Sequence, residues 1–286
     1  MTEAATGSKH PPSLVAGNPG RPATAGSGRN APESDRAKAD DGPAVRLDGV
    51  SKTFGSRCVL DNVSFDVPAG SGFIIIGRSG TGKSVTLRHI VRLVLPDRGK
   101  VFVGADEISS LTGAELSRVR RKIGFLFQNA ALFDSISVGE NVAFPLRRHT
   151  RLPDREIRDR AAAKLDSVGL GAEYDKMPAA LSGGMRKRAG LARAMALDPA
   201  LLLVDEPSAG LDPITTDEID QLLLDLKKRG GTTLIVVTHN IPSAKRLGDR
   251  LVMLHEGRIA ASGTPAELEQ SSDPLVRAFM SSQHSG

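Results

Sequence analysis

The chain has 286 residues and a single cysteine, Cys58, so it cannot form an internal disulfide bond. A lone thiol fits a reducing compartment such as the cytosol. No apolar run reaches the ~18–20 residues that a membrane-spanning helix needs. The first residues lack the basic-then-apolar order of a secretory signal. We therefore expect a soluble protein, which another subunit anchors if it works at a membrane.

The chain also lacks a large excess of positive or negative charge, since its formal net charge is only +5 at pH 7. The basic residues are dispersed rather than striped with aromatic residues, so no nucleic-acid partner is expected. Hydrophobic residues make up 40% of the chain and charged residues 25%, which is typical of globular proteins. The length suits one large or two modest domains.

Residues 1–43 differ from the rest of the chain. They are rich in Pro, Gly, Ser and Ala, they contain no aromatic residue, and their positive and negative charges balance. Such a segment cannot bury enough apolar surface to offset the entropy of the chain. We predict a disordered N-terminal extension, either dispensable or used as a docking tail.

Residues 77–84 read Gly-Arg-Ser-Gly-Thr-Gly-Lys-Ser and fit the phosphate-loop pattern G-x-x-x-x-G-K-[ST]. They follow a predicted buried strand at 72–76 and precede a helix predicted from Ser84 to about Leu95. The glycines let backbone N–H groups approach phosphate, and the helix N-terminus adds the positive end of its dipole. The run therefore predicts nucleoside triphosphate binding. The alternative is a glycine-rich turn with a chance Lys-Ser.

Within this loop, Lys83 supplies a positive charge for the β- and γ-phosphates, and the Ser84 hydroxyl can reach Mg²⁺. The predicted nucleotide-binding residues of the segment are Gly77, Arg78, Ser79, Gly80, Thr81, Gly82, Lys83, Ser84 and Val85.

A second signal is the apolar run Leu201–Val204, which ends in two adjacent carboxylates. Asp205 can hold the Mg²⁺ shell, as the equivalent acid does in phosphate-loop enzymes. Glu206 can polarise a water for attack on the γ-phosphate. The alternative is a strand end that faces solvent with two ordinary acids.

The hydrophobic pattern predicts two kinds of sheet. Residues 45–67 alternate like half-buried antiparallel strands. Continuous apolar runs at 201–204 and 233–237, with a helix at 221–229 between them, indicate a parallel sheet. Further strands are predicted at 99–103 and 123–127, and a hairpin at 251–261.

Helices are predicted over most of 139–195, with breaks near Pro145, Pro153, residues 169–171 and Pro178. Capping boxes are expected where helices begin at Thr112 and Thr264.

The third signal is Leu181-Ser182-Gly183-Gly184-Met185, followed by a basic run at 186–188. With it, the chain resembles the ATP-binding subunits of ABC transporters, whose signature is LSGGQ, over about residues 45–265. The resemblance implies an α/β fold of the P-loop NTPase class, the ABC-ATPase fold. It combines a RecA-like core, an antiparallel β subdomain and a helical signature subdomain. We expect the ABC ATPase domain at 44–264, its helical subdomain at about 130–195, and a C-terminal helical tail at 265–286.

The same resemblance implies roles for four more residues. Phe54 would stack on adenine, an interaction worth ~1–3 kcal/mol. Gln128 would link Mg²⁺ and the attacking water to the transmembrane partner. Asp212 would lie in the loop that crosses a dimer interface, and His239 would contact the γ-phosphate.

The expected cofactors are ATP and Mg²⁺. The expected catalytic residues are Lys83, Gln128, Glu206 and His239, and the expected metal ligands are Ser84, Gln128 and Asp205.

The resemblance further implies a homodimer of two head-to-tail copies. Ser182, Gly183 and Gly184 of one copy would cap the ATP held by Lys83 of the other, because a helix N-terminus offers N–H groups to an anion. Met185 replaces the usual glutamine, which puts polar contacts from this position to the ribose in doubt.

Within the family, the chain looks most like the ATPases of Mla-type phospholipid transport and their Mce-associated relatives. The similar runs are 127–135, 140–147, 181–188, 206–215 and 273–279. This implies an integral membrane permease, a Mce-domain lipid-binding protein, and a peripheral location on the cytoplasmic face of the bacterial inner (plasma) membrane. Phe133, Val142 and Phe144 could instead be core residues of the helical subdomain.

Three other readings compete with a lipid-transport ATPase. One is the ATPase of a small-solute importer, for example for polar amino acids. Another is a non-transport ABC protein that acts on DNA or ribosomes. The short segment between Gln128 and Leu181 disfavours the coiled coils of DNA-repair members, and ribosome-acting members usually hold two modules. A phosphate-loop kinase would leave residues 181–185 without a role.

Overall fold

The computed structural model describes residues 42–282, except for the side chains at 229 and 230. The predicted disorder of residues 1–43 falls almost wholly outside this range, and so do the last four residues of the predicted C-terminal tail. The expected domain boundaries at 44, 130, 195 and 264 stay predictions.

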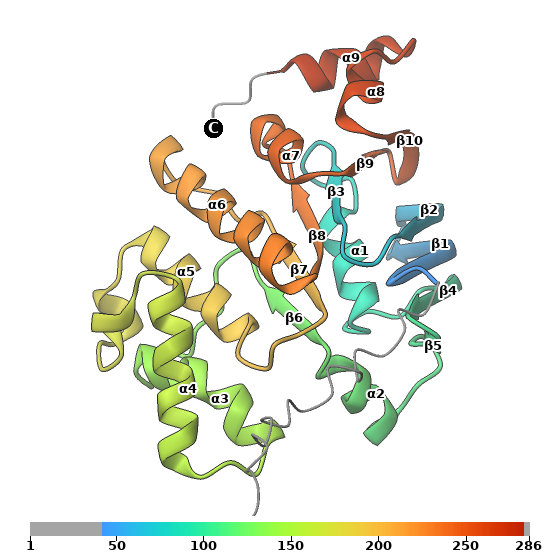
Figure 1. Cartoon of the computed structure of the whole chain (residues 1–286). Helices are drawn as coiled ribbons and strands as arrows, with labels where there is room; N and C mark the ends of the chain where they lie inside the picture. The colour runs from blue at the N-terminus through green and yellow to red at the C-terminus, as the bar shows by residue number, and fades with distance from the viewer. Residues whose placement is uncertain (1–41, 283–286) are drawn as a thin grey trace, which may run out of the picture. The chain divides into compact units, whose positions relative to one another are not determined.

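The centre of the described part is a sheet of six strands in the order β10-β9-β3-β8-β7-β6 (Figure 1). Five strands run parallel, and β10 pairs antiparallel with β9 at one edge. The parallel sheet and the hairpin predicted from the sequence are therefore confirmed. The strands are β3 (Gly72–Ile76), β6 (Ile123–Leu126), β7 (Leu201–Asp205), β8 (Thr233–Thr238), β9 (Arg250–His255) and β10 (Arg258–Gly263).

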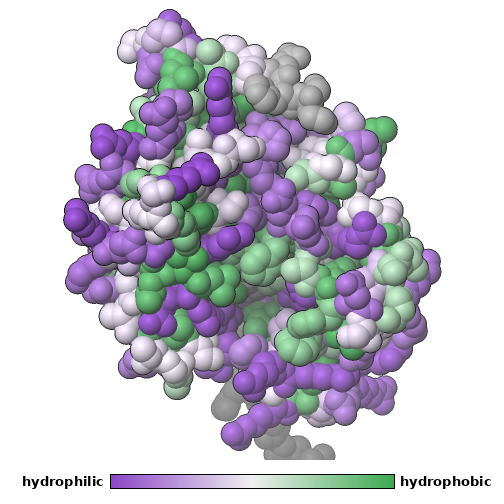
Figure 2. Space-filling view, turned by 180° about the vertical axis from the view of Figure 1, so that it is seen from behind, coloured by the Kyte–Doolittle hydropathy of each residue, from purple (hydrophilic) through white to green (hydrophobic). Residues whose placement is uncertain are grey.

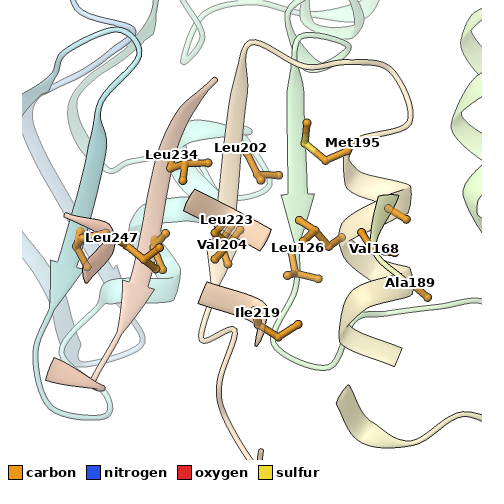
Figure 3. Close-up of a cluster of buried hydrophobic side chains, with 14 of the residues drawn as sticks. Leu126, Val168, Ala189, Met195, Leu202, Val204, Ile219, Leu223, Leu234 and Leu247 are labelled. Carbon is orange, nitrogen blue, oxygen red and sulfur yellow. The ribbon is translucent and has the colours of Figure 1, made fainter. Parts of the chain in front are cut away.

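The parallel strands are apolar on both faces because helices or strands cover both sides of the sheet. Successive side chains of a strand point to opposite faces. In β7, Leu202 and Val204 join one core cluster, whereas Leu201 and Leu203 join the other. Figure 3 shows the first cluster, in which Leu202, Val204 and their neighbours meet side chains of the adjacent helices.

A second sheet of the described residues has the order β2-β1-β4-β5 and is antiparallel. The predicted antiparallel strands are confirmed, although β1 and β2 are longer than expected. The bounds are β1 (Val45–Phe54), β2 (Arg57–Val67), β4 (Arg98–Val103) and β5 (Asp106–Glu107). Helix α1 (Lys83–Ile90) buries Leu87 and Ile90 in the cluster that these strands share with the central sheet.

Helix α1 is shorter than predicted, because the sequence pattern indicated an end near Leu95. The helix stops at Ile90, and Arg92 adopts φ 54°, in the left-handed region that an α-helix cannot continue through. The start of α2 (Gly113–Arg120) also departs from expectation. The Thr112 side chain makes no cap hydrogen bond, so the predicted capping box is wrong, and the one at Thr264 is present before α8 (Pro265–Glu269).

Three helices, α3 (Val138–His149), α4 (Asp154–Ser167) and α5 (Gly183–Ala194), pack beside one another at one side of the sheet (Figure 1). The predicted break at Pro145 is wrong, since this proline lies inside α3. Proline cannot donate a helical hydrogen bond, but burial of Val142 and Leu146 in the core offsets this loss and keeps the helix continuous. Short 3₁₀ turns at Gly171–Glu173 and Pro178–Ala180 precede α5.

The remaining helices are α6 (Pro213–Gly230), α7 (Ile241–Leu247) and α9 (Pro274–Ser281). Helix α6 begins eight residues before the predicted start at residue 221. Asp212 caps it and Pro213 occupies its first position, where a proline loses no hydrogen bond.

Within residues 42–282, no helix is both long and apolar enough to cross a membrane. Figure 2 shows one face of the molecule, on which hydrophobic side chains reach the surface in separate patches with polar residues between them. Phe133 and Phe144 are half exposed and their rings lie 5.0 Å apart, whereas Val142 is buried. Of the three residues considered as possible core, only Val142 is therefore fully in the core.

Candidate active site

The loop between β3 and α1 can form only with glycine at several positions. Gly77, Gly80 and Gly82 have φ values of 149°, 79° and 99°, which residues with a Cβ rarely adopt. A Cβ at Gly82 would also lie 2.5 Å from Leu60 Cδ2. The backbone of this loop is therefore shaped to approach a ligand closely.

Lys83 lies over the loop rather than extending into solvent. Its Nζ donates hydrogen bonds to the carbonyl oxygens of Gly77 at 2.8 Å and Arg78 at 3.1 Å. It also lies 3.5 Å from Oε1 of Glu206. Burial lowers the pKa of Lys83, and the nearby Glu206 carboxylate opposes that shift. The lysine charge is thus held where the glycine loop and the end of β7 meet.

Ser84 and Asp205 form a hydroxyl–carboxylate pair at the same edge of the sheet. Ser84 Oγ donates to Asp205 Oδ1 at 2.7 Å. Burial raises the pKa of Asp205, and the Ser84 hydrogen bond opposes this. Hydroxyl and carboxylate oxygens are ligands that Mg²⁺ accepts in proteins.

Glu206 connects the lysine to the end of β8. Its Oε2 lies 2.9 Å from Nδ1 of His239, and the His239 backbone N–H donates to the same oxygen at 3.4 Å. Parallel strands β3, β7 and β8 end at one edge, so the structure brings together Lys83, Ser84, Asp205, Glu206 and His239.

These groups fit a magnesium-bound triphosphate. Backbone N–H groups of the glycine loop, the N-terminus of α1 and the Lys83 ammonium suit phosphate oxygens. Within residues 42–282, no cluster of three His, Cys, Asp or Glu side chains could hold a metal by itself. A metal at Ser84 and Asp205 would therefore share its remaining ligands with the phosphates and water, as Mg²⁺ commonly does.

A cavity of about 360 Å³ lies beside the glycine loop. Its lining includes Ser79 and Thr81 of the loop, together with Arg57 and Cys58 from β2. Arg57 donates from Nη2 to the Gly80 carbonyl at 2.9 Å, and Cys58 is exposed. Neither residue was expected at the site, because nothing in the sequence at the start of β2 marks it as a neighbour of the glycine loop.

Phe54 and Gln128 lie at the ends of their strands. Phe54, the last residue of β1, is 47% exposed, and Lys52 Nζ lies 5.3 Å from its ring centre. Lys52 thus lies over one face of the ring, and about half of the residue's surface is exposed. Gln128 is exposed two residues after the end of β6.

The Ser-Gly-Gly run begins α5. Ser182 caps the helix, and its Oγ accepts a hydrogen bond from the Met185 N–H at 3.2 Å. Asp212 does the same for α6, accepting from the Thr215 N–H at 3.0 Å and the Thr215 hydroxyl at 2.7 Å. The two starts are adjacent, since a Cβ on Gly184 would collide with Thr215. Hydrogen bonds from the hydroxyl and N–H of Thr215 lower the pKa of Asp212.

This chain is similar in sequence to known proteins. Residues 60–209 match the family described as ABC transporter. The chain is 42% identical to the "Probable ribonucleotide transport ATP-binding protein mkl" of Mycobacterium leprae, over 86% of this chain and 71% of that protein. It is 40% identical to the "Intermembrane phospholipid transport system ATP-binding protein MlaF" of Escherichia coli K12, over 82% of this chain and 88% of MlaF. The chain belongs to the ABC transporter family.

Solved structures of ABC cassettes share the fold. One is a dimeric ATP-binding cassette in a post-hydrolysis state with ADP and Pi, at TM-score 0.72 and 35% identity, covering 77% of this chain and 98% of that one. Another is cbiO1 of Clostridium perfringens, part of an ABC transporter complex, at TM-score 0.73 and 27% identity, covering 84% and 96%. The predicted family, the α/β P-loop fold, the ATPase activity and the ATP and Mg²⁺ cofactors are confirmed.

One residue of this ABC cassette was missed by sequence reasoning. Lys187 belongs to the basic run on α5, yet its side chain is only 6% exposed. Its Nζ donates to the backbone carbonyl of Glu206 at 2.9 Å. A basic run on a helix carries no signal of which member turns inward, so only the packing of α5 against the sheet reveals the contact.

Proposed function

We propose that this chain is the ATPase subunit of a transporter that moves phospholipid between membranes through a separate permease. The observation that carries the proposal is the likeness to MlaF, at 40% identity over 88% of that protein. The mkl relative, named for ribonucleotide transport, favours a second candidate cargo. The chain spans 88% of MlaF and 71% of mkl, and we take phospholipid as the first candidate cargo.

In the proposed mechanism, the loop of residues 77–82 and Lys83 bind the triphosphate. Ser84, Asp205 and Gln128 would hold Mg²⁺, which supplies charge neutralisation at the β- and γ-phosphates. Glu206 orients and deprotonates the attacking water, and His239 holds the Glu206 carboxylate at 2.9 Å while facing the γ-phosphate. Phe54 stacks on the adenine ring.

We also propose that two copies assemble head to tail. The N-terminus of α5, with Ser182, Gly183 and Gly184, then caps the nucleotide held by Lys83 of the other copy. Asp212 lies at the same boundary. The dimeric cassette bound to ADP and Pi, which is 35% identical to the chain, supports a dimer.

The proposed assembly includes an integral membrane permease and a Mce-domain lipid-binding protein, on the cytoplasmic face of the bacterial inner membrane. The exposed pair Phe133 and Phe144, which follows Gln128 in the chain, supplies apolar surface for the permease contact. The proposed domains are the ABC ATPase at 44–264, with its helical subdomain at about 130–195.

The test is purification of the tagged chain from its native membrane in mild detergent, with mass spectrometry of the proteins and lipids that accompany it. A permease with a Mce-domain protein and phospholipid is the expected result. A permease with a soluble solute-binding protein would keep the ATPase and reject the lipid. Co-purification of the permease with ribonucleotides other than ATP and ADP, and without phospholipid, would favour the second cargo. An untagged strain controls for carry-over.

A further inference from the structure

A buried lysine on α5 has no part in the mechanism above. Lys187 is 6% exposed, and a buried ammonium is costly unless it is paired and hydrogen-bonded. Its Nζ donates to the main-chain carbonyl of Glu206 at 2.9 Å, rather than to a carboxylate side chain. The Lys187 ammonium therefore contacts the backbone of Glu206, the residue that we assign as general base.

Glu206 has a backbone conformation that needs support. Its φ is 47°, in the left-handed region, which is unfavourable for a residue with a Cβ. Its N–H donates to the Val237 carbonyl at 2.9 Å, and its carbonyl also accepts from the Ala209 N–H at 3.2 Å. The peptide is thus held by β8 on one side, and by Lys187 and the following turn on the other.

This conformation sets the direction of the carboxylate. Oε1 of Glu206 lies 3.5 Å from Lys83 Nζ, and Oε2 lies 2.9 Å from His239 Nδ1. If the carbonyl lost its charged donor, the residue could relax toward an ordinary φ. The carboxylate would then leave the position between Lys83 and His239.

We propose that Lys187 is a positioning residue for ATP hydrolysis, which fixes the Glu206 carbonyl and thereby aims the Glu206 carboxylate. Lys187 also links the Glu206 carboxylate to Ser182, because both Ser182 and Lys187 belong to α5. The proposed function places Ser182 against the nucleotide of the other copy. A helix rises only about 1.5 Å per residue, so a shift at Ser182 is passed rigidly to Lys187. The inference rests on the proposed function of Glu206.

The first test replaces Lys187 with Met, which has similar length and no N–H donor. Turnover at saturating ATP should fall on the order of 10²-fold, the effect of a misplacement of about 1 Å. The affinity for a fluorescent ATP analogue should stay unchanged. Lys187→Gln and Lys187→Arg keep a donor, and at least one of them should recover turnover. If both lose as much as the Met variant, the hydrogen bond to the carbonyl is not what matters, and the proposal is wrong.

A double-mutant cycle separates positioning from simple packing. In a Glu206→Gln background, Lys187→Met should cause no further loss in single-turnover hydrolysis, because both changes remove the same contribution. Losses that multiply would show that Lys187 acts independently of Glu206. If Lys187→Met does not fold, Lys187→Ala, which also has no donor, takes its place in the cycle.

Lys227 offers a matched control. It is also partly buried, and its Nζ lies 3.4 Å from the Leu247 carbonyl and 2.8 Å from Asp249, at the opposite end of the strands. Lys227→Met should lower the melting temperature and leave turnover unchanged. If Glu206→Gln alone leaves turnover normal, the proposed role of Glu206 fails. If Glu206→Gln lowers turnover but Lys187→Met leaves it normal, the Lys187 inference fails while the proposed role of Glu206 stands.

Discussion

The two parts of the proposed nucleotide-binding machinery differ in how far a single chain completes them. At the ends of β3, β7 and β8, Lys83 and His239 both contact the Glu206 carboxylate, and Ser84 contacts Asp205. At the starts of α5 and α6, the side chains of Ser182 and Asp212 cap their own helices and have no other partner within residues 42–282. The first part is preorganised before any partner arrives, which is what electrostatic catalysis requires.

The difference follows from the elements that carry each part. The carboxyl ends of parallel strands meet at one edge, so their side chains converge within one sheet. A helix N-terminus instead directs free N–H groups outward, and these need a ligand or a partner from outside the helix. We propose that the second part acts on a group presented by another molecule.

The distinction between the two parts would be wrong if the strand-end site and the starts of α5 and α6 contacted the same nucleotide within one chain. Lys83→Ala removes the phosphate-binding charge, and Ser182→Arg removes a helix cap and puts a positive charge at the positive end of α5. Each variant alone should lose essentially all coupled turnover. Mixed dimers, formed by refolding or co-expression, should regain hydrolysis at the one site that combines the two intact parts. Absence of recovery, with mixed dimers verified by two different tags, would contradict the head-to-tail arrangement.

Glu206→Gln tests the preorganised part. Loss of the general base should lower turnover by roughly 10²–10⁴-fold and leave ATP binding intact. Single-turnover hydrolysis and binding of a fluorescent ATP analogue give the two readings. Glu156→Gln is the matched control, since Glu156 forms an exposed ion pair with Arg160 on α4. Equal turnover in the Glu206 and Glu156 variants would remove Glu206 from the mechanism.

Phe54→Ala sharpens the comparison at the base-binding end. Stacking of a base on an aromatic ring is worth ~1–3 kcal/mol, so the dissociation constant for ATP should rise about 5- to 150-fold. Turnover at saturating ATP should hardly change, because the ring does not touch the phosphates. Phe54→Trp should restore affinity. Unchanged affinity in the Ala variant would mean that adenine binds elsewhere.

The smallest predicted effect is on stability and concerns Asp220, which lies on α6. It is buried, one of its carboxylate oxygens has no partner among the described residues, and it lines a cavity of about 330 Å³ with the 208–211 turn. Burial raises the pKa of Asp220 above its ordinary 3.8, against a hydrogen bond from Ser243. A carboxyl with a raised pKa binds its proton more tightly in the folded state. Folding stability therefore falls as the pH rises from 3.8 through the raised pKa.

Asp220→Asn removes this ionisation. At neutral pH the variant should melt ~2–4 °C higher, the shift that about 1 kcal/mol produces in a domain of this size. The gain should shrink as the pH is lowered toward the ordinary pKa of the carboxyl. ATP affinity should not change. A variant that melts lower at neutral pH would show that the charged carboxylate stabilises the fold.

The parts predicted well from the sequence are those encoded by short runs. The glycine loop needs its residues in one segment after one strand, and the pair Asp205 and Glu206 directly ends another. Parallel pairing of β7 and β8 follows from two apolar runs and a helix between them. Such local patterns also identify the family, so the fold and the ATPase activity were predictable.

The misses arise where packing overrides local preference. Pro145 lies within α3 because the residues around it are buried in the core. Lys187 points inward because α5 packs against the edge of the sheet. Arg57, the first residue of β2, donates to the Gly80 carbonyl in the glycine loop. These contacts join segments that are far apart in the chain, and no single run of residues encodes them.

The solitary thiol beside the glycine loop makes this cassette convenient for spectroscopy. Cys58 is exposed, is the only cysteine of the chain, and lines the same cavity as Ser79 and Thr81. A thiol-reactive fluorophore therefore attaches at one position without removal of other cysteines. It would report changes at the glycine loop in real time from the unaltered sequence.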